Sequence, residues 1–174
     1  MSEDTIKQEQ EKWLTFVTNL NPNIDPHAMR LMDEMRRTAH AIFRMGESSI
    51  SAAGLSYAKY RLLMRLHFSE TVEGREGLSP SELSDHQGTS RNTISSLIRN
   101  LEEDGYIERH LNKKDRRKFN ICLTTAGRAL FREHASRHLD EINGCFGSLN
   151  AEEQATFSRL LHKVRENIDA DSKE

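Results

Sequence analysis

The sequence lacks the features that define several large classes of protein. It has only two cysteines in 174 residues, Cys122 and Cys145, and they do not form a CxxC pair. Zinc ribbons and disulfide scaffolds are therefore excluded, and a reducing cytoplasm fits best. No apolar run approaches the roughly 18 to 20 residues that a membrane span needs, and residues 1–12 are polar without the apolar core of a signal peptide. We expect a cytoplasmic protein with no membrane partner.

Sequence motifs of common enzyme classes are also missing. There is no Gly-rich phosphate loop, no GxSxG, no HExxH and no pair of carboxylates isolated in an apolar setting. The eight histidines are scattered along the chain. We therefore expect no enzymatic activity, no cofactor and no bound metal.

Positive charge is concentrated in one part of a chain that is slightly acidic overall. The formal net charge is -2, but residues 86–118 hold eight Lys or Arg against five Asp or Glu, a local charge of +3. Five of the six residues from Lys113 to Lys118 are basic. A basic segment of this kind is typical of a nucleic-acid contact, although most charge runs are only solvated surface.

Helix signals dominate both ends of the chain. An amphipathic pattern over 8–20 ends at a Pro-containing linker, and Asp25 with Pro26 predicts the start of a helix over 26–46. Two further apolar patterns predict helices after Thr124 and after Asn150, the second with a stripe that ends at Ile168. The small domain in the middle of the chain has its own core and is too small to cover the apolar faces of these helices as well. A second copy of the chain is therefore the expected partner.

The middle of the chain contains shorter elements in a characteristic order. Ser56 is placed to cap a helix over 57–68, and Ser79-Pro80-Ser81-Glu82 is a capping box that opens a short helix to Gly88. A tight turn, a helix from Thr89 or Ser90 to Gly105, and two strands around a basic hairpin follow. Strands are expected only near 77–79, 106–111 and 117–123.

This order predicts a mostly α fold with a small antiparallel β wing, that is, a winged helix-turn-helix flanked by N- and C-terminal dimerisation helices. We expect an N-terminal extension helix and linker over 1–25 and dimerisation helices over 26–56 and 125–168. The DNA-binding lobe is expected over 57–124, and a frayed tail over 169–174.

The second helix of the motif has the composition of a DNA-reading helix. The first exposed positions of this helix are small or hydrogen-bonding and carry no acid, which suits base edges and phosphates in a major groove. Its three acids, Glu102, Glu103 and Asp104, lie at the far end, where they would not repel phosphate. We expect DNA contacts from Ser90, Arg91, Asn92, Thr93, Ser95, Ser96 and Arg99 on this helix, and from Lys113, Lys114, Asp115, Arg116 and Arg117 on the hairpin. Two such helices in a dimer match a pseudo-palindromic operator on double-stranded DNA.

The stretch LIRNLEEDGYIERHLNKKDRRKFNICLTTAGR resembles the signature of the MarR family of regulators. The matching positions are Leu101-Glu102, Gly105, Ile107 and Arg109, Asp115 and Arg117, then Leu123-Thr124 and Gly127. The resemblance covers roughly residues 26–168. It implies a dimer with interlocking terminal helices, a repressor relieved by a small molecule, and an Asp115 that orients Arg117 toward the minor groove.

The identity of the signal stays open between three interpretations. A cleft that holds a small anionic aromatic effector would use His40, Arg44, Tyr60 and Arg61, with surface salt bridges and a core tyrosine as the competing interpretation. Glu133, His134 and His138 resemble part of a zinc site, but surface or interface histidines are favoured because the other ligands look absent. A redox response through Cys122 or Cys145 is the third interpretation, and a protein-interaction module without DNA is the alternative function.

Overall fold

The computed structural model describes residues 3–112, 115 and 117–171. The chain divides into two compact units at the boundary between Gly46 and Glu47. Among the described residues, none of the helices combines the length and the apolar character needed to cross a bilayer.

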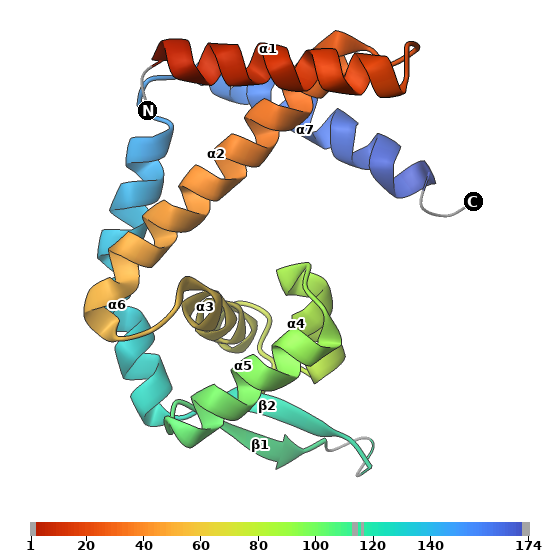
Figure 1. Cartoon of the computed structure of the whole chain (residues 1–174). Helices are drawn as coiled ribbons and strands as arrows, with labels where there is room; N and C mark the ends of the chain where they lie inside the picture. The colour runs from red at the N-terminus through yellow and green to blue at the C-terminus, as the bar shows by residue number, and fades with distance from the viewer. Residues whose placement is uncertain (1–2, 113–114, 116, 172–174) are drawn as a thin grey trace. The chain divides into compact units, whose positions relative to one another are not determined.

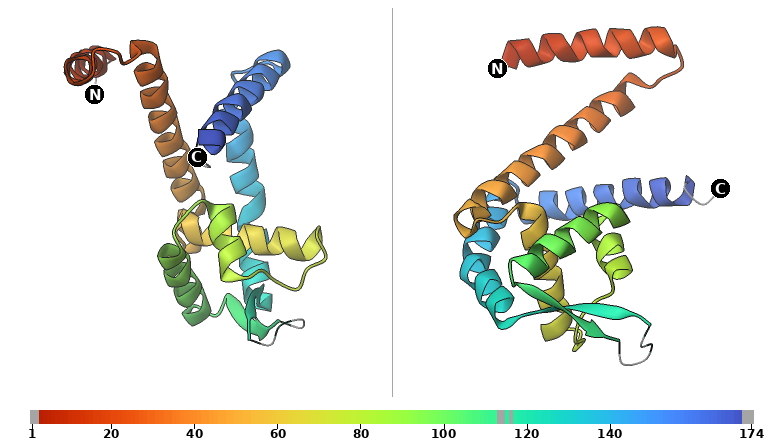
Figure 2. Two further views of the ribbon diagram at one scale, coloured as in Figure 1. Left: turned by 90° about the vertical axis from the view of Figure 1, so that its right-hand side faces the viewer. Right: turned by 60° about the horizontal axis from the view of Figure 1, so that its bottom comes forward.

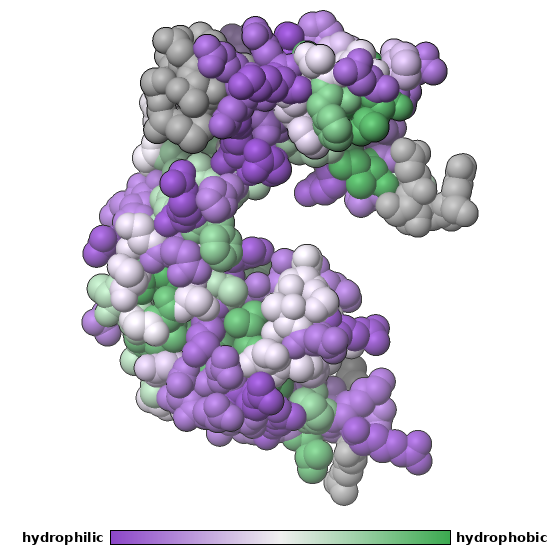
Figure 3. Space-filling model, viewed as in Figure 1, coloured by the Kyte–Doolittle hydropathy of each residue, from purple (hydrophilic) through white to green (hydrophobic). Residues whose placement is uncertain are grey.

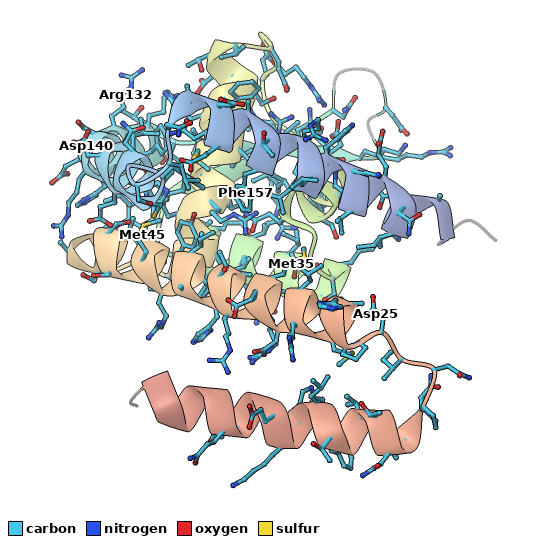
Figure 4. All side chains as sticks on the ribbon, turned by 90° about the horizontal axis from the view of Figure 1, so that it is seen from above. Asp25, Met35, Met45, Arg132, Asp140 and Phe157 are labelled. Carbon is cyan, nitrogen blue, oxygen red and sulfur yellow. The ribbon has the colours of Figure 1, made fainter. Side chains whose placement is uncertain are left out.

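The first unit contains α1 (Glu3–Leu20) and most of α2 (Pro26–Ile50). Asp25 stands immediately before α2 (Figure 4), and its carboxylate accepts the backbone N–H of His27 at 2.9 Å. Pro26 is the first helical residue, as the sequence predicts. The prediction that this helix ends at Gly46 is wrong by four residues. Ser49 and Ile50 are fully buried in the second unit, and this packing favours continuation of the helix through a polar stretch that looks like a loop.

The second unit is built on three short helices, α3 (Tyr57–Thr71), α4 (Pro80–Gln87) and α5 (Arg91–Glu103) (Figure 1). The predicted caps are present: Ser56 accepts the N–H of Lys59, and Ser79 and Glu82 form a complete capping box. Burial of apolar side chains from all three helices supplies the core. Its fully buried members include Leu62, Leu63, Leu66, Leu83, Ile94, Ile98 and Leu101.

A two-stranded antiparallel hairpin extends from this core (Figure 2). Strands β1 (Ile107–Leu111) and β2 (Phe119–Leu123) pair in register from Ile107 opposite Leu123 to Leu111 opposite Phe119. Leu78 adds an isolated bridge, since its N–H and C=O both bond to Ile121. The three predicted strand regions and the α-rich winged-helix class are therefore confirmed.

Two long helices complete the second unit, α6 (Thr125–Cys145) and α7 (Ala151–Asp171). Thr124 caps α6 by accepting the N–H of Gly127 at 3.1 Å. Asn150 and Glu153 exchange capping hydrogen bonds of 2.8 and 3.0 Å at the start of α7. The helix continues to Asp171, whereas the sequence predicted a frayed tail from residue 169; no Pro or Gly interrupts the chain there. The last three residues of that tail lie outside the described residues.

Candidate nucleic-acid interface

The start of α5 is set by a glycine turn and a serine cap. Gly88 ends α4 in the left-handed conformation with φ 61°, which a side chain at this position would disfavour. Two residues later Ser90 accepts the N–H of Thr93 at 3.1 Å, and its hydroxyl lies 2.9 Å from that of Thr93. The local sequence Gly88-Thr89-Ser90 thus turns the chain sharply and begins a new helix, with no charged residue in the turn itself.

Two opposite faces of α5 have opposite chemistry. Ile94, Ile98 and Leu101 are buried in the core and Leu97 is half-buried against it. The other face is exposed, and the surface of this region is mostly hydrophilic (Figure 3). This exposed set contains all seven residues predicted for the helix: Ser90, Arg91, Asn92, Thr93, Ser95, Ser96 and Arg99. The apolar contacts fix the helix axis, so the polar side chains are presented from a rigid element.

Two of the three acidic residues at the far end of α5, Glu102 and Asp104, are paired with cations. Lys59 on α3 donates to Asp104 at 2.8 Å, and the Arg109 guanidinium donates to both carboxylate oxygens of Glu102, at 3.0 and 3.1 Å. No acidic residue lies in the first turn of the helix. The negative charge of α5 is therefore confined to its C-terminal end and partly neutralised there.

Arg109 also connects α5 to the hairpin. It belongs to β1, and its guanidinium carbon lies 4.8 Å from the centre of the Phe119 ring on β2, close enough for a cation–π contact. One side chain of β1 thereby contacts both α5 and β2. The sequence marked Glu102 and Arg109 only as parts of a signature, and their pairing is not visible from spacing alone.

The wing turn is closed by hydrogen bonds around Asp115. Its backbone C=O accepts the N–H of Lys118 at 2.9 Å, and its carboxylate accepts the backbone N–H of Arg117 at 3.1 Å. The carboxylate also lies 3.7 Å from the Lys118 ammonium. Asp115 therefore acts on the backbone of Arg117, which itself is exposed. The predicted phosphate contacts Lys113, Lys114 and Arg116 lie outside the described residues.

The predicted effector residues differ in accessibility. Tyr60 is only 1% exposed, and its ring stacks on Phe131 at 5.5 Å and meets the edge of His138 at 5.2 Å. Burial raises the pKa of its hydroxyl to about 12. Tyr60 is thus a core tyrosine, as the competing interpretation had it.

The other three effector candidates are more accessible. Arg61 is half-buried beside Tyr57, and His40 and Arg44 are exposed on the part of α2 that belongs to the first unit.

The two histidines of the zinc interpretation do not have the same surroundings. His138 is buried, so its assignment to the surface or an interface is wrong: its Nδ1 lies 2.9 Å from the Ser49 hydroxyl, and its ring packs on Tyr57 and Tyr60. His134 is half-buried. Within the described part of the chain, no three His, Cys, Asp or Glu side chains are grouped so as to hold a metal ion. The buried Ser49–His138 pair is a core contact that the sequence did not indicate.

The two cysteines also differ. Cys122 is buried and its thiol donates to the carbonyl of Glu76 at 2.6 Å, while burial raises its pKa. A raised pKa lowers the thiolate fraction and so lowers reactivity. Cys145 is exposed at the end of α6.

Comparison with known proteins places this geometry in a family. The model of the MarR family matches residues 53–118, which include α3, α4, α5 and β1. The transcriptional repressor YetL of Bacillus subtilis is 27% identical over 90% of this chain and 92% of its own length. The transcriptional regulator PrsX of Escherichia coli is 30% identical over 69% of this chain and 70% of its own length.

A solved structure shares the fold. The crystal structure of the Staphylococcus aureus MepR–DNA complex matches with a TM-score of 0.70 at 22% identity, over 77% of this chain and 93% of that one. The chain belongs to the MarR family of DNA-binding transcriptional regulators.

Proposed function

We propose that the protein is a cytoplasmic, homodimeric repressor that reads a pseudo-palindromic operator with two copies of α5. One observation carries the proposal: the Ser90 cap and the N-terminal part of α5 expose seven hydrogen-bonding residues with no acid among them, while the other face of α5 is anchored in the core. A B-DNA major groove is about 12 Å wide and admits one helix, whose N-terminal residues meet the base edges. The relative YetL is named a transcriptional repressor, which supports repression rather than activation.

Individual residues are assigned by hydrogen-bonding geometry. Arg91 is suited to guanine and Asn92 to adenine, because each side chain can form a pair of hydrogen bonds with that base. Ser95 donates its hydroxyl proton to the carbonyl of Arg91 at 2.8 Å, so its oxygen is left to accept rather than donate. Arg99 and the hydroxyls of Ser90, Thr93 and Ser96 are assigned to phosphates or base edges.

The hairpin supplies the second contact. Arg117 is exposed at the turn, where a guanidinium can enter a narrow minor groove and meet its enhanced negative potential. Lys113, Lys114 and Arg116 are assigned to phosphates on the basis of the sequence.

The dimer proposal rests on apolar side chains that the chain itself leaves exposed. In the first unit Trp13, Phe16 and Leu31 are each more than half exposed. On α7 the stripe predicted from the sequence is exposed along its length, and Figure 4 labels Phe157, its first member. The stripe comprises Phe157, Leu160, Leu161, Val164 and Ile168. Extensive apolar surface on helices is typical of an obligate interface, so we assign residues 26–56 and 125–168 to dimerisation, 57–124 to the DNA-binding lobe and 1–25 to an extension.

We further propose that a small anionic aromatic effector releases the operator. Arg61 is the cation that supports this, because it lies half-buried on α3, the helix that carries the core of the lobe. His40 and Arg44 remain assignments from the sequence. A ligand releases DNA only if it binds the DNA-incompetent arrangement more tightly, and such couplings are typically about 1 to 3 kcal/mol.

Fluorescence anisotropy with the intergenic DNA upstream of the protein's own gene tests the proposal. Arg117→Ala should weaken operator binding by about 1 to 3 kcal/mol, the scale of one good groove contact. Arg91→Ala and Asn92→Ala should instead relax the preference for the operator over altered half-sites. Lys12→Ala is the matched control, because this substitution also removes one positive charge from an exposed position, on α1, outside the segments assigned to DNA binding and dimerisation. Equal losses in Arg117→Ala and the control would refute the wing assignment.

The effector is tested in the same assay. Aromatic carboxylates and phenols titrated into the protein–DNA complex should release DNA from the wild type but not from Arg61→Ala. Release by zinc or an oxidant, with none by the aromatic panel, would reject the anionic effector.

A further inference from the structure

The base of the wing holds a polar side chain with an unusual number of local contacts, Asn112. It stands directly after β1, and its backbone N–H donates to the carbonyl of Lys118 at 2.9 Å, just before β2. This hydrogen bond extends the strand pairing one step beyond Leu111 and Phe119. Asn112 therefore marks the point where the paired strands end and the turn begins.

The side-chain amide of Asn112 uses both of its ends. Its Oδ1 accepts the backbone N–H of Asp115 at 3.1 Å, and its Nδ2 donates to Oδ1 of Asn120 on β2 at 3.1 Å. An amide is the one group of this length that both donates and accepts, so aspartate, leucine or alanine cannot make both contacts. Asn112 is half-buried, which makes these hydrogen bonds less exposed to competition from water.

The contacts continue to the wing arginine. Asn112 holds the backbone of Asp115, and the carboxylate of Asp115 in turn accepts the backbone N–H of Arg117 at 3.1 Å. Two successive hydrogen bonds thus connect the end of β1 to the residue assigned to the minor groove. A loop that is already ordered in the free protein loses less conformational entropy when it binds DNA, so its order favours affinity.

We propose that Asn112 is a positioning residue for the wing, which orients the backbone of Arg117 through Asp115 without touching DNA itself. The proposal rests on the assignment of Arg117 to the minor groove. Loss of one net hydrogen bond corresponds to about a fivefold change in an equilibrium constant, so loss of both side-chain contacts should weaken operator binding about five- to twentyfold.

A double-mutant cycle on the full-length protein tests whether Asn112 acts through Arg117. Operator affinity is measured by fluorescence anisotropy for the wild type, Asn112→Ala, Arg117→Ala and the double variant. We expect Asn112→Ala to weaken binding about five- to twentyfold in the wild type but less than about twofold in the Arg117→Ala background. Asn23→Ala, an exposed asparagine in the linker between α1 and α2, is the matched control and should leave affinity unchanged. An equal loss in both backgrounds would overturn the proposal.

Hydrogen exchange of the free protein gives a second readout that is independent of DNA. In Asn112→Ala the amides of Asp115 and Arg117 should exchange faster, whereas amides in the core of α3 should not change. Asn120→Ala, which leaves the bond from Asp115 to Asn112 intact, should have a smaller effect on both amides.

These readouts separate the two proposals. If Arg117→Ala binds the operator normally while the amides of Asp115 and Arg117 exchange faster in Asn112→Ala, the assignment of Arg117 to the minor groove is wrong and the positioning role of Asn112 stands. If exchange at Asp115 and Arg117 does not change, the positioning role is refuted.

Discussion

Gly127 is the position where one added methyl group should have the largest local effect. It lies in the first turn of α6 and is buried. A Cβ built there would collide with the backbone carbonyl of Tyr106 and would lie 3.3 Å from Cδ2 of Leu123. Because the obstacle is backbone rather than a flexible side chain, the base of the wing and the start of α6 would have to separate.

The cost of Gly127→Ala can be worked from these contacts. Overpacking of a tight site costs about 1 to 3 kcal/mol. Displacing the Tyr106 carbonyl also strains the hydrogen bond that it accepts from the N–H of Thr124 at 3.1 Å, which adds about 1 kcal/mol. We expect a total loss of roughly 2 to 4 kcal/mol in the free energy of unfolding, or about 5 to 15 °C in Tm for a chain of this size.

Gly144→Ala in the same helix is a matched control. Its Cβ would meet nothing within 4 Å, and it has no positive φ, so alanine should be neutral or stabilise by up to about 1 kcal/mol through helix propensity. Urea unfolding followed by circular dichroism, at one protein concentration because the protein is proposed to be a dimer, compares the variants. Equal stabilities for the two variants would refute the argument from close packing.

Three further predictions concern association, salt and pH. Leu161→Asp places a charge in the exposed stripe of α7 and should convert the dimer to a monomer at micromolar concentration, as measured by light scattering; a wild-type monomer would reject the assigned interface. A plot of log binding constant against log salt concentration should have a slope near -5 for about six neutralised phosphates. An operator affinity that does not change from about 50 to 200 mM salt would exclude phosphate contacts as the source of that affinity. Burial lowers the pKa of His138, so the unfolded chain binds its proton first, near pH 6.5, and stability should fall as the pH drops from there toward the folded-state pKa. His138→Gln should flatten this loss in thermal melts between about pH 7 and 5, and an unchanged profile would assign the acid sensitivity to other groups, such as His67, whose pKa burial also lowers.

Local signals were sufficient where the structure depends on neighbours in the chain. The caps at Ser56, Ser79 and Thr124 and the end of α4 at Gly88 follow from residue types at fixed offsets. The same holds for α5, because a 3.6-residue period alone separates the buried Ile94, Ile98 and Leu101 from the exposed polar face. The order of these elements was enough to predict the winged-helix class and the residues that α5 exposes.

Contacts between residues distant in sequence were decided only by the tertiary structure. Ser49 and His138 meet across 89 positions, and this contact explains both the longer α2 and the burial of a histidine assigned to the surface. Tyr60 was predicted as a ligand contact by its chemistry, but the rings of Phe131 and His138 enclose it in the core. Periodicity reports which face of a helix is apolar, whereas which side chains cover that face depends on how the helices pack.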